Sequence, residues 1–126
     1  MFVRAGWADG NVEPWDFTDI DRTVSGGISV KGKEWGRPED TIGVAGVING
    51  ITGVHAAYFN DGGLGILIGD GQLPHVTLEK IFETYYSYAL TSTLALGLDY
   101  QLIAAPGYNS QRDPVSVGTV RVRVQF

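Results

Sequence analysis

A strict alternation of apolar and polar residues over the last twelve positions constrains the fold of this chain most. In the segment 115–126 (VSVGTVRVRVQF), every second position is apolar at Val120, Val122, Val124 and Phe126, and polar residues stand between them. Side chains two positions apart lie on the same face of a β-strand, and β-branched residues favour strands. The segment therefore predicts a strand with one apolar and one polar face.

The same alternation recurs upstream, more weakly in the first half of the chain. It predicts five further strands, at 2–7, 22–32, 41–50, 80–90 and 92–103. A helix is the alternative for 80–90, because Leu78, Phe82 and Tyr86 recur every four residues. The tyrosines of this segment and its period-two neighbours favour a strand. We therefore predict an all-β fold of six antiparallel strands that run up and down.

The predicted connections alternate between long and short. Long connections fall at 8–21, 51–79 and 104–114, and short ones at 33–40 and at Thr91. This pattern is typical of a meander with loops at one end and turns at the other, as in outer-membrane barrels. The segment 51–79 is too long for an unstructured loop of a compact domain, so we expect it to fold back on the protein. We expect residues 1–126 to form a single unit.

Composition excludes several classes of protein. The net charge of −5 argues against a nucleic-acid binder, and the absence of cysteine excludes disulfides and thiolate metal sites. Two histidines, His55 and His75, are too few for a histidine-based metal centre. No nucleophile elbow or pair of carboxylates stands out, and the glycines of 63–69 do not match a dinucleotide fingerprint. We expect no catalytic residue, no cofactor and no metal, and hence no enzyme.

Membrane insertion by strands stays open on the same grounds. The chain has no run of about 18 apolar residues that would form a membrane-spanning helix. A transmembrane β-barrel needs no such run, because only alternate residues of its strands meet lipid. The first residues, MFVRAGWADG, lack the basic and apolar regions of a signal peptide. An outer-membrane location then implies truncation, with Met1 as an added or internal start.

Five stretches of sequence carry a resemblance to a known family. They are FVRAGWADG (2–10), GRPEDTIGVA (36–45), GLGILIGDGQLP (63–74), the long run from EKIFETYYSYAL to AAPGYNSQRDPVSV (79–117), and the terminal RVRVQF (121–126). Together they resemble the carbohydrate-selective porin family (OprB-like), specifically its C-terminal portion. Ala105 and Asp113 depart from the family pattern, which typically has Asn and Gly there. The resemblance covers essentially the whole chain.

This resemblance implies an outer-membrane β-barrel through which sugars diffuse passively. It implies that Phe126 contributes a signal for the barrel-assembly machinery, and that the C-terminus lies on the periplasmic side. The long connections would then face the exterior. A closed barrel needs about eight strands or more, so six cannot close one. The chain is then a fragment that lacks N-terminal barrel strands, a homo-oligomer whose copies share a sheet, or a sequence with a different fold.

In the barrel interpretation, one strand face meets outer-membrane lipid and the other lines a channel for sugars. Arg121 and Arg123 would each cost roughly 2–4 kcal/mol if they faced lipid at mid-depth, so they must face water or carboxylates. Glu83 and Asp99 are the nearest candidate partners, either in structural ion pairs or beside a bound sugar. The predicted channel-lining residues are Arg4, Lys31, Glu83, Tyr85, Asp99, Gln101, Arg121 and Arg123. The predicted lipid-facing residues are Phe82, Tyr86, Leu94, Leu96, Leu98, Val120, Val122 and Val124.

Two further groups stand near the predicted strand ends. The aromatic residues Trp7, Trp35, Tyr88, Tyr108 and Phe126 suit the aromatic girdles of a membrane barrel or the packed core of a soluble β protein. The acidic loop 9–21 offers Asp16, Asp19 and Asp21 as hard ligands for calcium, but its spacing lacks the calcium-loop pattern, and a solvated outer loop is the favoured interpretation.

The leading hypothesis is therefore an outer-membrane porin segment that mediates passive diffusion of carbohydrates. The alternative is a soluble β domain, derived from a porin, that self-associates through its unpaired strand edges and binds carbohydrate or a partner chain.

Overall fold

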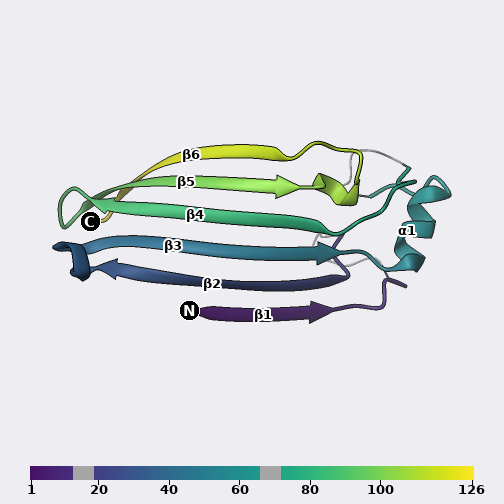
Figure 1. Cartoon of the computed structure of the whole chain (residues 1–126), viewed down its shortest axis with the longest axis horizontal. Helices are drawn as coiled ribbons and strands as arrows, with labels where there is room; N and C mark the ends of the chain where they lie inside the picture. The colour runs from purple at the N-terminus through teal and green to yellow at the C-terminus, as the bar shows by residue number, and fades with distance from the viewer. Residues whose placement is uncertain (13–18, 66–71) are drawn as a thin grey trace.

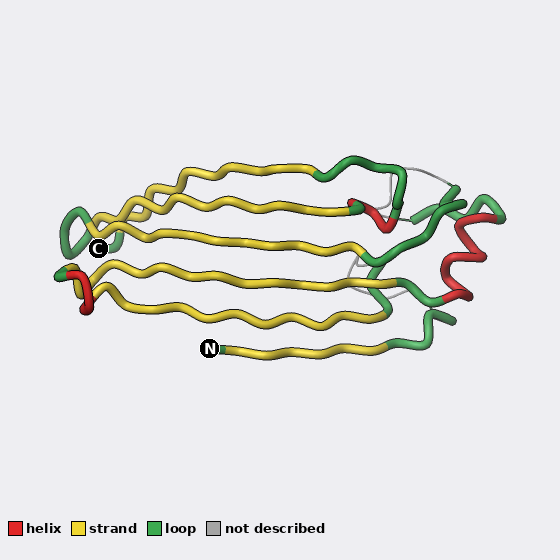
Figure 2. Tube along the Cα trace, viewed as in Figure 1, coloured by secondary structure: helices red, strands yellow, loops and turns green. Residues whose placement is uncertain are grey.

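Six antiparallel strands form a single sheet in which each strand pairs with its neighbours in the sequence (Figures 1 and 2). The computed structural model describes residues 1–12, 19–65 and 72–126. The strands are β1 (Phe2–Trp7), β2 (Arg22–Gly32), β3 (Arg37–Gly50), β4 (Glu79–Ala89), β5 (Leu94–Ala104) and β6 (Val115–Val124). The predicted all-β meander is confirmed, the sheet is open, and the segment for which a helix was the alternative is strand β4.

The first of the short connections is tighter than the sequence predicted. A 3-10 turn, η1 (Lys33–Trp35), reverses the chain after β2, and Gly36 follows it with a φ of 75°. This left-handed conformation favours glycine, which has no Cβ. Strand β3 consequently begins at Arg37, four residues before the start predicted at Thr41. The prediction of a link over 33–40 was therefore too long.

Long and short connections lie at opposite ends of the sheet. Figure 1 shows the β2–β3 and β4–β5 connections at one end, together with the C-terminus, and we call this the turn end. The β1–β2, β3–β4 and β5–β6 connections lie at the other end, which we call the loop end. This is the asymmetry that the lengths of the predicted connections indicated.

The turn end is held by a polar cluster around Asp40. This side chain is 1% exposed and accepts hydrogen bonds from the Arg37 guanidinium, from the Tyr86 hydroxyl at 2.6 Å and from the Ala89 backbone N–H at 2.8 Å. The indole of Trp35 donates to the Tyr86 hydroxyl at 3.2 Å. A carboxylate with this many donors is fully compensated for its burial. The cluster therefore ties η1 to strands β3 and β4.

The loop end contains the buried apolar residues. Among the described residues, the buried hydrophobic cluster consists of Phe59, Leu73 and Tyr108, with Ile51 packed against it. None of these four belongs to a strand. Phe59 comes from helix α1 (Gly53–Asn60), and Tyr108 from the 3-10 turn η2 (Pro106–Tyr108). We call the described residues of this end, 8–12, 19–21, 51–65, 72–78 and 105–114, the cap, and the six strands the wall.

Helix α1 was not predicted by the alternation of residues. It begins after Thr52, whose hydroxyl accepts a hydrogen bond from the backbone N–H of His55 at 3.3 Å, as an N-cap residue does. Its apolar residues surround the helix without a clear stripe, so periodicity could not reveal it. The described part of the predicted long loop 51–79 thus holds a helix at the loop end, where its Phe59 packs with Leu73 and Tyr108.

Candidate functional site

The register of the sheet places all eight predicted channel-lining residues on one face of the wall. Directly paired residues of antiparallel strands point to the same side, and so do residues two apart. One row across the sheet runs through Lys31, Thr41, Ser87, Gly97 and Arg121. Further rows on the same face hold Arg4, Glu83, Tyr85, Asp99, Gln101 and Arg123. We call this surface the polar face.

The opposite surface is apolar over its whole width, and we call it the apolar face. A central row runs through Val30, Ile42, Tyr86, Leu98 and Val120. The predicted lipid-facing residues all lie on this side of their strands: Phe82, Tyr86, Leu94, Leu96, Leu98, Val120, Val122 and Val124. Leu98 is 51% exposed and Val120 69%, and such a continuous exposed apolar surface marks contact with another apolar phase.

A groove of about 400 Å³ crosses the polar face over strands β4, β5 and β6. Five of the eight predicted residues line it: Glu83, Tyr85, Asp99, Arg121 and Arg123. Gln101 lies beside it and donates a hydrogen bond to Glu83 at 3.1 Å. Lys31 and Arg4 lie farther across the sheet, on β2 and β1. The fold thus gathers most of the predicted set in one place.

Small residues on the polar face make room for the groove and for its tyrosine. A Cβ on Gly43 would come within 2.2 Å of the Tyr85 ring, so this ring lies over strand β3 where the chain has no side chain. Gly97 likewise stands directly opposite Arg121. The half-buried ring of Tyr85, with a guanidinium on the same face, offers flat surfaces for stacking. These glycines therefore shape the surface that the polar residues line.

The arginines of the groove have no carboxylate partner in close contact. No ion pair within 4.0 Å joins Arg121 or Arg123 to Glu83 or Asp99, all four of which are described residues. Arg123 donates to the side-chain oxygen of Gln125 at 3.3 Å. Direct ion pairs and contact with a bound sugar therefore both stay predictions for these four residues. The arginine donors thus stand more than 4.0 Å from the carboxylates of the groove, and Glu83 is hydrogen-bonded to Gln101.

The predicted aromatic positions fall in different surroundings. Trp35 and Tyr88 lie at the turn end, where the Arg37 guanidinium packs over the Tyr88 ring at 3.9 Å, and Trp7 is 73% exposed near the loop end. Tyr108, in contrast, is 4% exposed in the cap, so its assignment to a girdle was wrong. Burial, reinforced by the nearby acidic groups Glu79, Asp19 and Asp21, raises the pKa of the Tyr108 phenol above its usual range.

Of the three acidic residues considered for calcium, Asp21 is hydrogen-bonded to other protein groups and Asp19 lies beside His55. Asp21 is 4% exposed and accepts from the Thr52 backbone N–H at 2.7 Å and from His55 Nδ1 at 3.0 Å, and Asp19 Oδ1 lies 3.8 Å from His55 Nε2. Asp16 lies outside the described residues, as does the GDG motif at 69–71. No group of three or more His, Cys, Asp or Glu side chains suited to a metal ion occurs in the described ranges.

No pattern in the sequence indicated the contact between Asp21 and His55. The two residues stand 34 positions apart, in segments that were both predicted as loops. Only the topology, which brings the β1–β2 and β3–β4 connections to the same end, places them together. A spacing motif could not have found this pair.

The two faces and the strand lengths define the class of protein. Strands β2 to β6 have 10 to 14 residues, about what a strand needs to cross a bilayer, and the wall is apolar on one side and polar on the other. Within the described residues, no helix is long and apolar enough to cross a membrane. The wall is thus a sheet of the porin type.

The family follows from comparison with known proteins. The model of the carbohydrate-selective porin, OprB family, matches residues 1–126, so the chain belongs to this family and the resemblance seen in its motifs is confirmed. The family comprises outer-membrane transport channels and not enzymes. No curated protein and no solved structure matches the chain.

Proposed function

We propose that this chain forms part of the wall of an outer-membrane channel and that its polar face lines a path for passive diffusion of carbohydrates. The observation that carries the proposal is the division of the wall into an apolar and a polar face, with the groove of Glu83, Tyr85, Asp99, Arg121 and Arg123 on the polar one. Membership of the OprB family supports sugars as the substrate class.

The groove has the chemistry that a sugar requires. A sugar presents many hydroxyl groups, and each must exchange its hydrogen bonds with water for bonds with the wall as it passes. Arg121 and Arg123 supply donors, Glu83 and Asp99 supply acceptors, and Tyr85 supplies an aromatic plane. Because these groups are not locked into ion pairs with one another, a passing sugar meets donors and acceptors that are already in place.

The edges of the sheet determine which partners the wall needs. Strands β1 and β6 each pair on one side only, and unpaired backbone groups are not tolerated in hydrocarbon. We propose that these edges pair with further strands, either of additional copies of this chain or of a longer chain. We propose further that lipid covers the apolar face and that Phe126 is accessible to the barrel-assembly machinery at the periplasmic turn end.

Conductance in a planar bilayer tests the channel directly. We expect the purified chain, inserted from detergent, to give ion conductance that glucose or maltose blocks in a dose-dependent way. Arg121→Gln should raise the half-blocking concentration about tenfold, because loss of one charge-assisted hydrogen bond costs about 1.4 kcal/mol or more. Val122→Ala, one position along on the apolar face, should leave it unchanged.

Two results would contradict the proposal. One is a discrete, detergent-free particle without affinity for membranes, which is what the alternative of a soluble self-associating domain expects. The other is a channel whose sugar block is equally insensitive to both substitutions, since the polar face would then not line the path.

A further inference from the structure

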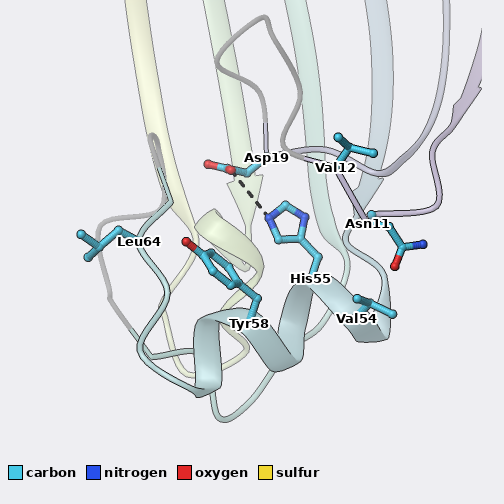
Figure 3. Close-up of a pocket in the computed structure, with 8 residues that line it drawn as sticks. Asn11, Val12, Asp19, Val54, His55, Tyr58 and Leu64 are labelled. Atoms are coloured by element: carbon cyan, nitrogen blue, oxygen red, sulfur yellow. Dashed lines mark ion pairs between the residues drawn. The ribbon is translucent and has the colours of Figure 1, made fainter.

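A second cavity lies in the cap, outside the groove of the wall. It has a volume of about 280 Å³ and lies between the β1–β2 connection and helix α1 (Figure 3). Its lining combines polar and apolar side chains: Gly10, Asn11, Val12, Asp19, Val54, His55, Tyr58 and Leu64. The family assignment gives these residues no role. From the sequence only a metal-binding role could be considered, for Asp19 and His55, and the described geometry does not support it.

Helix α1 presents two ring side chains to this cavity. His55 and Tyr58, one turn apart, both extend from the helix toward the side on which Asp19 lies (Figure 3). The His55 ring stacks on the buried Phe59 ring with their centroids 4.7 Å apart, and it is held in place by this contact. The Tyr58 side chain is 54% exposed, so its ring is available to a ligand.

Asp21 fixes the orientation of the His55 imidazole. Its two carboxylate oxygens lie 3.0 and 3.1 Å from Nδ1 of His55, and an ionised carboxylate can only accept, so Nδ1 carries the hydrogen of this bond. The same carboxylate accepts from the Thr52 backbone N–H and hydroxyl at 2.7 and 3.0 Å. Asp21 is thus a positioning residue that turns Nε2 of His55 toward Asp19.

The spacing of Nε2 and the Asp19 carboxylate suits a pair of neighbouring hydroxyl groups. Nε2 lies 3.8 Å from Oδ1 of Asp19, which is beyond the distance of a direct hydrogen bond. Two polar atoms at this separation can each contact one of two adjacent hydroxyls, while the carboxylate keeps further acceptor positions for its other bonds. The Tyr58 ring and the Val54 and Leu64 side chains offer apolar contact beside them.

We propose that this cavity is a binding site for a single sugar unit at the loop end, with His55 and Asp19 contacting a vicinal diol and Tyr58 packing against the ring. The inference rests on the proposed function, because the site would hold a sugar at the loop end of the channel before the sugar reaches the groove. It is separate from the groove, because none of the residues that the structure describes lines both cavities.

Histidine-selective ¹⁵N labelling tests this site in the full chain in detergent micelles. The chain has two histidines, so His75 serves as an internal control. We expect added glucose to shift the Nε2 signal of His55 in a saturable manner and to leave the signals of His75 unchanged. The same concentration of 2-propanol, which has one hydroxyl, should not produce the shift.

Variants then separate this site from the groove. Tyr58→Ala should weaken the glucose response of His55 about tenfold, whereas Tyr58→Phe should retain most of it, and Arg121→Gln should leave it intact. The inference would be overturned if glucose did not shift the His55 signal, or if 2-propanol shifted it equally. It would also be overturned if Arg121→Gln abolished the response to glucose. If sugars still blocked the conductance in these cases, the proposed channel function would hold without this binding site.

Discussion

The wall and the cap of this chain are stabilised in opposite ways. The cap buries Phe59, Leu73 and Tyr108 and satisfies a nearly buried Asp21, as a small soluble domain would. The wall is held by strand pairing and leaves its large apolar side chains exposed on one face. In water such an exposed apolar face would promote aggregation, whereas in a bilayer it is the surface that lipid covers. The composition of the cap therefore suits an aqueous environment, and that of the wall suits a membrane.

The largest expected effect separates the two regions by stability. Phe59→Ala should lower the free energy of local opening of the cap by about 3–5 kcal/mol, because it deletes the central side chain of a closely packed cluster. Hydrogen exchange of the α1 amides should accelerate accordingly, and exchange of the strand amides should not change. Val54→Ala, at an exposed site of the same helix, should change the free energy of local opening of the cap by less than about 0.5 kcal/mol. Equal acceleration in the strands would show that the wall depends on the cap.

The next effect tests the division of the wall into two faces. Leu98→Arg places a charge on the apolar face and should cost about 2–4 kcal/mol of unfolding free energy in lipid vesicles. Thr119→Arg, on the polar face of the adjacent strand, should cost less than about 1 kcal/mol because its charge stays in water. Urea titration of the vesicle-bound protein measures both. Similar costs for the two substitutions would contradict a lipid-facing side.

The smallest expected effect is a dependence of the cap on alkaline pH. Burial raises the pKa of the Tyr108 phenol, so the folded cap favours its neutral form. The stabilisation that this gives is complete below the ordinary tyrosine pKa of about 10 and is lost as pH rises through the higher folded value. The phenolate absorbance of the unsubstituted chain and of Tyr108→Phe is titrated with pH, and their difference reports Tyr108. Its titration midpoint should lie above that of a free tyrosine. A midpoint at the ordinary value would show that the cap is open to water.

The wall could be predicted from sequence because its information is local. Alternation within each strand determines which residues share a face, and the length of the connections determines which strands are neighbours. The eight residues proposed to line the channel were placed on one face on this basis alone, before any register was known. The largest error in a strand boundary is at Arg37, because Gly36 allows a turn tighter than the sequence suggested; the other strand ends differ from the prediction by no more than two residues.

The cap could not be predicted because its contacts join distant segments. Asp21 and His55 stand 34 residues apart, and Tyr108 packs against Phe59 from another connection. Neither contact follows from the alternation of residues or from a motif. The position of Tyr108 near a strand end did not distinguish it from an exposed tyrosine. The cavity beside His55 likewise depends on the topology, which brings the β1–β2 and β3–β4 connections to one end of the sheet.

Cysteine scanning along β5 tests the central claim, that the wall separates lipid from water, most directly. The chain contains no cysteine, so each single substitution at positions 94 to 101 gives one reactive thiol. In lipid vesicles, a water-soluble maleimide should label the polar-face positions 95, 97, 99 and 101 and leave 94, 96, 98 and 100 unlabelled. Uniform labelling along the strand would contradict the account, because both faces would then lie in water.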